Sequence, residues 1–188
     1  MLSLIRCAFL ALAAVLTICP APSFAQAARA VGLEAMAGAG SGHGGEFFDT
    51  GFPAAHLGVT VRVRQRGSMA VYGEGGYDWL GLGMGHKAVC IPSSRGGCKP
   101  AYPDMAGPTG SLGVLLVPSR RIETRVGVGA AAYSVDGTRV GAVIGQLNAA
   151  WFVTPHIGLV VGGRAAVVPG YRHDLLSAIP VLLGLRLR

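Results

Sequence analysis

The residues best suited to catalysis are His173, Asp174 and Ser177, which lie close together near the C-terminus. A serine nucleophile needs a histidine base and an acid that orients the base, so this set has the residue types of a deacylase. Adjacent histidine and aspartate residues are common in loops, however, and nothing in this spacing forces the side chains together. The sequence therefore favours a protein that is not an enzyme, with no catalytic residues assigned.

A second group with chemical potential is His43, Glu46 and Asp49, whose types and spacing resemble metal ligands. They fall in a polar, glycine-rich stretch where solvated side chains are the simpler explanation. His56 lies in an alternating segment and is expected to join an interior polar network rather than to bind a metal. We therefore expect no metal and no other cofactor.

Residues 1–25 are predicted to be a cleaved signal peptide, which leaves residues 26–188 as one domain. Arg6 precedes an almost wholly apolar run over residues 7–18, and small residues, Ser23 and Ala25, suit cleavage after Ala25. The run is shorter than the ~20 residues of a membrane-spanning helix. Lipidation at Cys19 is disfavoured because the residue before it, Ile18, is large.

Removal of the signal peptide leaves two cysteines, Cys90 and Cys98, in the segment CIPSSRGGC. An isolated pair in an exported chain indicates a disulfide that closes a small loop. A zinc site would need two further ligands, and only His86 is near. We predict the disulfide.

Composition excludes several classes of protein. The net charge is +7, but the arginines are spread along the chain without a basic run, which argues against a nucleic-acid partner. The 30 glycines, with few helix-forming runs, argue against a helical fold. No apolar stretch of about 20 residues follows the signal peptide, so a helical membrane protein is not expected.

Large apolar residues alternate with small or charged ones through most of the chain, as in strands with one apolar and one polar face, here called the oily and the wet face. In the last segment Ile179, Val181, Leu183 and Leu185 share the oily face, and Arg186 lies on the other. The predicted strands cover approximately residues 29–40, 54–65, 69–82, 107–117, 122–135, 139–153, 157–168 and 178–188.

These eight strands predict an all-β, antiparallel, up-and-down transmembrane β-barrel. The turns after the second, fourth and sixth strands are short, and loops are expected at residues 41–51, 83–105 and 169–177. Short turns at one end and longer loops at the other are typical of bacterial outer-membrane barrels. Eight strands enclose only enough space for packed side chains, so a diffusion pore is not expected.

Charged residues of both signs fall on the wet faces and can pair inside a narrow barrel, as buried charges require. The predicted interior polar network is Glu34, Arg62, Arg64, Glu74, Asp78, Glu123, Arg125, Arg164 and Arg186. Tyr77, Trp79 and Trp151 lie on oily faces near the strand ends and are predicted membrane-interface aromatics. The alternative is a soluble lipocalin-like barrel whose oily faces turn inward around a hydrophobic ligand.

The signal peptide, the eight alternating strands, the short turns and the interior Glu/Arg set together resemble the small outer-membrane barrels of the OmpA/OmpX type. The resemblance implies a monomer in the bacterial outer membrane, with outer-membrane lipid and the barrel-assembly machinery as partners. The chain departs from the pattern at Leu187-Arg188, where members of this group usually end in an aromatic residue.

The resulting expectation is a non-enzymatic outer-membrane protein whose loops have a structural, adhesive or surface-shielding role. Some barrels of this size modify lipid A, so a lipid A enzyme is a lesser alternative. The sequence does not indicate an extracellular ligand.

Overall fold

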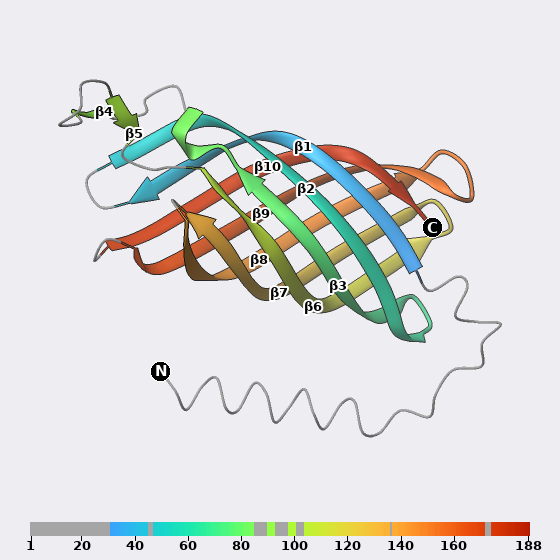
Figure 1. Ribbon diagram of the computed structural model, residues 1–188. Coiled ribbons are helices and arrows are strands. Elements are labelled where there is room, and N and C mark those ends of the chain that lie inside the picture. Colours follow the sequence, from blue (N-terminus) through green and yellow to red (C-terminus); the bar gives the residue numbers. More distant parts are fainter. Residues whose placement is uncertain are drawn as a thin grey trace, which may run out of the picture.

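The computed structural model describes residues 31–44, 47–84, 90–92, 98–100, 104–135, 137–171 and 174–188. Eight antiparallel strands form a closed barrel, which confirms the predicted fold class (Figure 1). The strands are β1 (Val31–Gly44), β2 (Phe47–Arg66), β3 (Met69–Leu80), β6 (Met105–Ser119), β7 (Ile122–Val135), β8 (Thr138–Phe152), β9 (Ile157–Tyr171) and β10 (Asp174–Leu187).

The barrel closes by pairing its first strand with its last. The β1–β10 ladder runs from Leu33 opposite Leu187 to Gly44 opposite Leu176, and every other neighbouring pair follows the order of the chain. Closure leaves the barrel without an edge strand, which removes the usual site of edge-to-edge aggregation from it. The described part of the chain contains no helix with the length and hydropathy to cross a membrane.

The outward face of the barrel is apolar. Leu57, Val128 and Leu183 expose 62, 70 and 64% of their surface, and similar side chains surround the barrel. The predicted inward and outward faces of the strands are confirmed for most positions. The lipocalin-like alternative is wrong, because its apolar faces would point inward.

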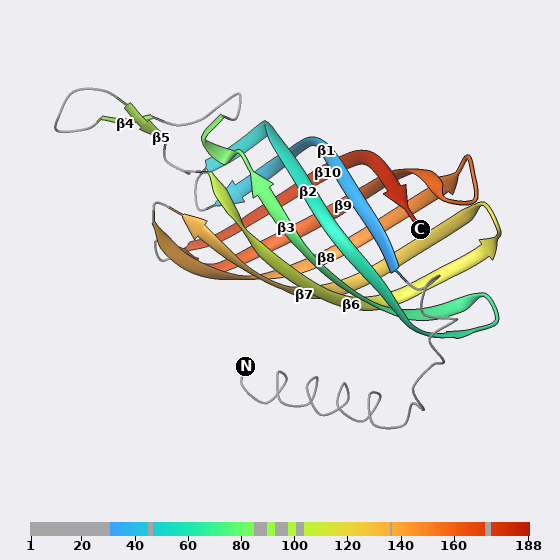
Figure 2. The same cartoon turned by 45° about the vertical axis from the view of Figure 1, so that its right-hand side comes forward.

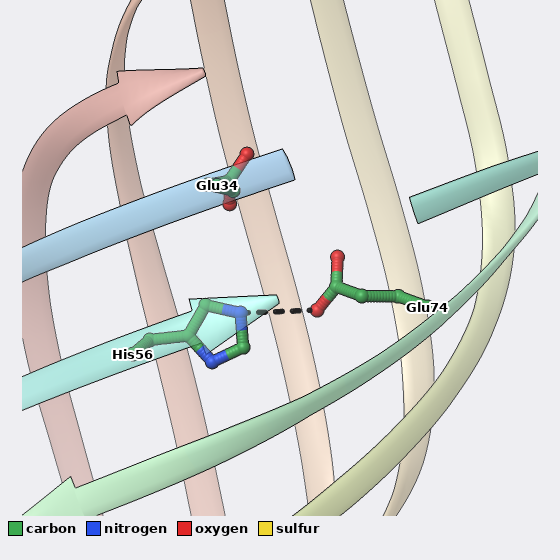
Figure 3. A group of neighbouring side chains, drawn as sticks. All are labelled: Glu34, His56 and Glu74. Atoms are coloured by element: carbon green, nitrogen blue, oxygen red, sulfur yellow. Dashed lines mark ion pairs between the residues drawn. The ribbon is translucent and has the colours of Figure 1, made fainter. Parts of the chain in front are cut away.

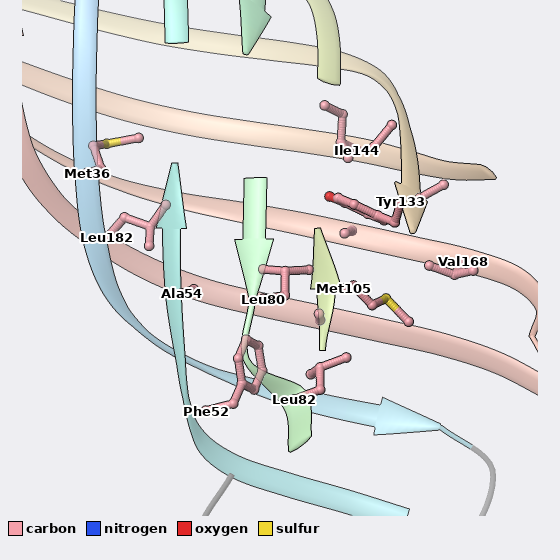
Figure 4. Close-up of a cluster of buried hydrophobic side chains, with 14 of the residues drawn as sticks. Met36, Phe52, Ala54, Leu80, Leu82, Met105, Tyr133, Ile144, Val168 and Leu182 are labelled. Atoms are coloured by element: carbon pink, nitrogen blue, oxygen red, sulfur yellow. The ribbon is translucent and has the colours of Figure 1, made fainter. Parts of the chain in front are cut away.

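The interior has a mainly apolar half and a charged half, in which a few apolar side chains are also buried. The apolar half lies toward the β1–β2 and β3–β6 connections and contains Phe52, Leu80, Met105 and Tyr133, each at most 4% exposed (Figure 4). On β8, Ile144 also points inward, and the β7–β8 ladder has no register shift. A large apolar residue on the inward face of this strand therefore reflects a lumen lined by both apolar and polar side chains, rather than a bulge.

Two of the three predicted loops are wrong, because the strands continue through them. β1 extends to Gly44 and β2 begins at Phe47, whereas residues 41–51 had been expected to form a loop. β9 and β10 likewise extend over most of residues 169–177. In β2 the register shift leaves Gly51, with a positive φ of 84°, without a partner and so interrupts the alternation. In β1 the residues after Gly40 are small or polar, so the apolar pattern ends before the strand does.

The long connection is the one between β3 and β6. It contains a short 3-10 helix, η1 (Leu82–Met84), and a two-stranded sheet of β4 (Cys90–Pro92) and β5 (Cys98–Pro100). Figure 2 shows this sheet beyond the barrel, at the end opposite the C-terminus.

Two predictions, the disulfide and the signal peptide, concern groups that the structure does not describe. In the β4–β5 sheet Cys90 lies opposite Pro100 and Cys98 opposite Pro92, but the cysteine side chains are not described. The predicted signal peptide, residues 1–25, also falls outside the described residues. The disulfide and the signal peptide remain predictions.

Candidate functional site

The charged half of the interior is the densest polar site in the described part of the chain. Alternate residues of six strands point into it at neighbouring levels, and each is at most 5% exposed. We call this group the charged cluster: Glu34 (β1), His56 (β2), Glu74 and Asp78 (β3), Glu123 and Arg125 (β7), Arg164 (β9) and Arg186 (β10).

Toward the short turns, carboxylates and guanidinium groups alternate along the barrel axis. Arg186 Nε lies 3.5 Å from Glu123 Oε2, and Arg186 Nη1 donates to Glu34 Oε2 at 3.2 Å. Arg125 Nη2 donates to the same glutamate oxygen. Each carboxylate in this part therefore contacts a positive group, as buried charges require.

Arg125 links this part to the upper part of the cluster, because its Nη1 also donates to Glu74 Oε2 at 2.9 Å. Arg164 then donates from Nη1 to Glu74 Oε1 at 3.1 Å and from Nε to Asp78 Oδ2 at 2.8 Å. The Tyr133 hydroxyl donates to the same oxygen of Asp78 at 3.0 Å. The ion pairs thus form one continuous chain from mid-barrel to the short-turn end.

His56 lies between two carboxylates of β3. Its Nδ1 is 2.6 Å from Asp78 Oδ1. On its other side, Nε2 is 3.4 Å from Glu74 Oε1, the contact that Figure 3 shows as a dashed line. Two glycines make room for the ring: a Cβ on Gly58 would lie 2.6 Å from His56 Nε2, and a Cβ on Gly76 would lie 2.8 Å from Cε1. The small residues of the wet faces therefore have a packing role here.

The glycine next to the histidine ring gives a direct test of this packing. Gly76→Ala is expected to destabilise the barrel by about 1–3 kcal/mol, because the new methyl group overpacks the interior. Its Cβ would also lie 2.5 Å from the Leu57 carbonyl oxygen, which is backbone and cannot rotate away. Gly75→Ala is the matched control, since its Cβ would have no neighbour within 4 Å. The measurement is urea unfolding in vesicles, and equal midpoints for the two variants would contradict the packing argument.

Seven of the nine predicted network residues lie in the charged cluster, and two do not. Arg62 is at the rim: its side chain is 23% exposed, and its Nη2 donates to Glu123 Oε1 at 3.2 Å. Arg64 lies outside the interior and is a correction. A register shift between Arg62 and Arg64 pairs Arg64 with outward-facing Val71, so the bulge moves it to the outer face.

Two residues that the predicted network omitted also point into the barrel, as the alternation of their strands implies. Gln146 donates to the Tyr72 hydroxyl at 3.0 Å and to Ser111 Oγ at 2.9 Å. Arg188 donates from Nη1 to Glu123 Oε1 at 2.6 Å and lies over the Phe152 ring, 3.6 Å from its centroid. Both residues have the inward parity of their strands, and this was the signal that could have included them.

The predicted interface aromatics occupy the outer surface to different extents. Tyr77 and Trp151 are 52 and 53% exposed, whereas Trp79 is half-buried. Trp79 lies toward the β3–β6 connection and Trp151 toward the short-turn end. Their role at the membrane interface remains a prediction.

The residues considered for catalysis and metal binding at the other end of the barrel are only partly described. Ser177 donates its hydroxyl hydrogen to the His43 carbonyl oxygen at 3.3 Å, across the β1–β10 ladder. The side chains of His173 and Asp174 are not described, nor are those of Glu46 and Asp49. The structure therefore assembles no nucleophile–base pair from the described residues of this group.

Within the described residues, one group has donor atoms close enough for a metal: Glu34, His56 and Glu74, whose donors lie within 4.8 Å of one another (Figure 3). Arg125 contacts both glutamates, and Arg164 also contacts Glu74. A divalent cation would lie beside these guanidinium groups, which would repel it strongly in a medium of low dielectric constant. The group is better suited to ion pairing.

This assignment predicts that Zn²⁺ does not stabilise the barrel. Refolding with Zn²⁺ or with a chelator is expected to give the same thermal unfolding midpoint, because a ligand of the native state raises that midpoint. A higher midpoint with Zn²⁺ that disappears in His56→Ala would show instead that the group binds metal.

No protein-family model and no curated protein matches the sequence. Among solved structures, Neisserial surface protein A (NspA) is similar, with a TM-score of 0.59, 10% identity, and coverage of 84% of this chain and 96% of that chain. Ail, the attachment invasion locus protein of Yersinia pestis, has a TM-score of 0.47 at 11% identity, covering 84% of this chain and 98% of that chain. The similarity to NspA confirms the expected fold of a small outer-membrane barrel.

Proposed function

We propose that this protein is a non-enzymatic barrel of the bacterial outer membrane whose β3–β6 connection is its working part. The observation that carries the proposal is the combination of an apolar outer face with a filled interior. A surface of exposed leucine and valine side chains around a closed barrel is stable in a bilayer and unstable in water. The fold shared with NspA, a surface protein by its name, supports the same role.

The filled interior argues against transport. Tyr72 and Tyr133 are fully buried, and Arg125 is 1% exposed, so side chains occupy the lumen at several levels. Eight-stranded barrels have no spare width for a water channel. A role at the surface is then the function that this architecture supports best.

The β3–β6 connection is the element available for such a role. Residues 81–104 separate β3 from β6, whereas the other three connections at this end join strands that are nearly continuous. Long loops on a rigid scaffold commonly carry binding functions. We propose an adhesive or shielding role for this segment, stabilised by a disulfide between Cys90 and Cys98.

Cell fractionation and electrophoresis test the location. We expect the protein in the outer-membrane fraction, with a shift in gel mobility only after boiling in detergent, because closed barrels resist detergent in the cold. We also propose that it is inserted by the barrel-assembly machinery and remains monomeric. Protein in the soluble periplasmic fraction, with no heat-dependent shift, would overturn the proposal.

Replacement of residues 85–103 tests the role of the connection. A variant with a short glycine–serine turn is expected to keep the heat-dependent shift, because the eight strands pair without this segment. Cells with this variant should lose binding to surfaces, if the role is adhesive, or become more sensitive to agents added outside the cell, if the role is shielding. A control in which a glycine–serine linker of the original length replaces the segment shows whether its amino-acid sequence, or only its length, is needed. Unchanged surface properties in both variants would exclude the segment as the working part.

A further inference from the structure

The short-turn end of the barrel carries a group of exposed arginines. Arg64 and Arg66 lie at the end of β2, and Arg120 and Arg121 form the turn between β6 and β7. We call these four residues the arginine collar. Arg62 and Arg188, each about one-quarter exposed, lie just inside the mouth of the barrel.

The two turns that carry the collar are neighbours. β3 pairs with β6, and the backbone N–H of Val117 donates to the Ser68 carbonyl at 2.7 Å, which joins the β2–β3 turn to the end of β6. Gly67 completes that tight turn with a positive φ of 60°. The collar is therefore one patch on two hydrogen-bonded, neighbouring turns rather than separate surface charges.

No described acidic residue is exposed at this end. Glu34, Glu74, Asp78 and Glu123 are all buried in the charged cluster. The other described acids are Asp49, Asp104 and Asp174, which belong to the opposite ends of β2, β6 and β10. Among the described side chains, the short-turn end therefore presents exposed basic groups and no exposed acidic group.

The collar lies where the apolar outer face ends. Arg66 pairs with Met69, which is 53% exposed, and Arg64 pairs with Val71, which is 38% exposed. Arg121 immediately precedes Ile122, which is 44% exposed. If the apolar face is in the bilayer, these arginines lie at the level of the lipid headgroups, which long basic side chains can reach.

We propose that the arginine collar binds the phosphate groups of anionic phospholipids in the periplasmic leaflet. Guanidinium groups bind phosphate oxygens through paired N–H donors, and their charge complements an anionic membrane surface. This inference rests on the proposed transmembrane location, with the short turns in the periplasm. It names anionic phospholipids as the lipids bound at this end, and it explains why the exposed charges there are basic.

The test measures lipid selectivity at the protein surface. The full-length mature protein is inserted into phosphatidylcholine vesicles, and spin-labelled phosphatidylglycerol is compared with spin-labelled phosphatidylcholine for association with the barrel. We expect a preference for phosphatidylglycerol that weakens with salt and falls to near unity when all four collar arginines are changed to glutamine. Each arginine should contribute up to about fivefold.

Two pairs of substitutions keep the test valid if the fourfold variant does not fold. Arg64→Gln with Arg66→Gln, and Arg120→Gln with Arg121→Gln, should each remove part of the preference. Arg139→Gln is the matched control, because Arg139 is exposed at the opposite end of the barrel and meets the same lipid in symmetric vesicles. The control should keep the full preference.

The outcomes separate this inference from the proposed function. Insertion into phosphatidylcholine without a preference for phosphatidylglycerol would overturn the lipid site alone. A preference that survives all collar substitutions, or that Arg139→Gln also removes, would overturn it as well. Failure of the wild-type protein to insert into any bilayer would overturn both.

Discussion

Arg125→Met should destabilise the barrel by about 3–5 kcal/mol, the usual effect of breaking a buried ion pair by removing one partner. Arg125 is 1% exposed and donates to Glu34, Glu74 and Thr60. Methionine fills much of the same volume but leaves two carboxylates with fewer positive neighbours. Urea unfolding of the protein in vesicles, followed by tryptophan fluorescence, measures the change in free energy.

Three further variants show whether charge rather than packing is responsible. Arg139→Met removes an exposed arginine and is expected to change stability by no more than about 0.5 kcal/mol. Glu34→Gln is made alone and together with Arg125→Met. In the double variant it should recover part of the lost stability, because it removes one of the buried charges that Arg125→Met leaves with fewer positive neighbours. A coupling energy near zero in this double-mutant cycle would mean that the two residues do not interact in the folded barrel.

The charged cluster was largely predictable, because alternation fixes which side chains share a face. Glu34, Glu74 and Arg164 were assigned to the interior from parity alone, and each is at most 5% exposed. The partner of each charge could not be predicted, since pairing depends on the stagger between strands. Arg125 meets Glu34 and Thr60 across the lumen, and no local pattern indicates those contacts.

Most of the failures come from a local change in the period of two. The shift between Arg62 and Arg64 moves Arg64 to the outer face, where a strict alternation would have placed it inside. The unpaired Gly51, with its positive φ, hides the continuation of β2, whereas β1 continues through small and polar residues that show no apolar alternation. A one-residue irregularity reverses the facing of every side chain after it, so register errors spread along a strand.

A second large loss of stability is expected for a charged substitution on the apolar outer face. Leu183→Arg should destabilise the barrel by about 2–4 kcal/mol in a bilayer, which is the range for arginine at the midplane of a transmembrane barrel. Leu183 is 64% exposed and lies at the middle of the outward apolar residues of β10, between Ile179 and Leu187. Its outward position leaves the charged cluster intact, so the effect reports on the surroundings of the barrel.

Leu187→Arg is the matched control, because it places the same side chain on the same strand at the short-turn end. An arginine at that depth reaches the headgroups, so its effect should be about 0–1 kcal/mol. The difference between the two variants, measured by urea unfolding in phosphatidylcholine vesicles, reports how deeply the centre of β10 is immersed. In water the order would be different: arginine at Leu183 would improve solubility and leave the fold unchanged. Equal free energies of unfolding for the two variants would therefore mean that the apolar face is not covered by lipid.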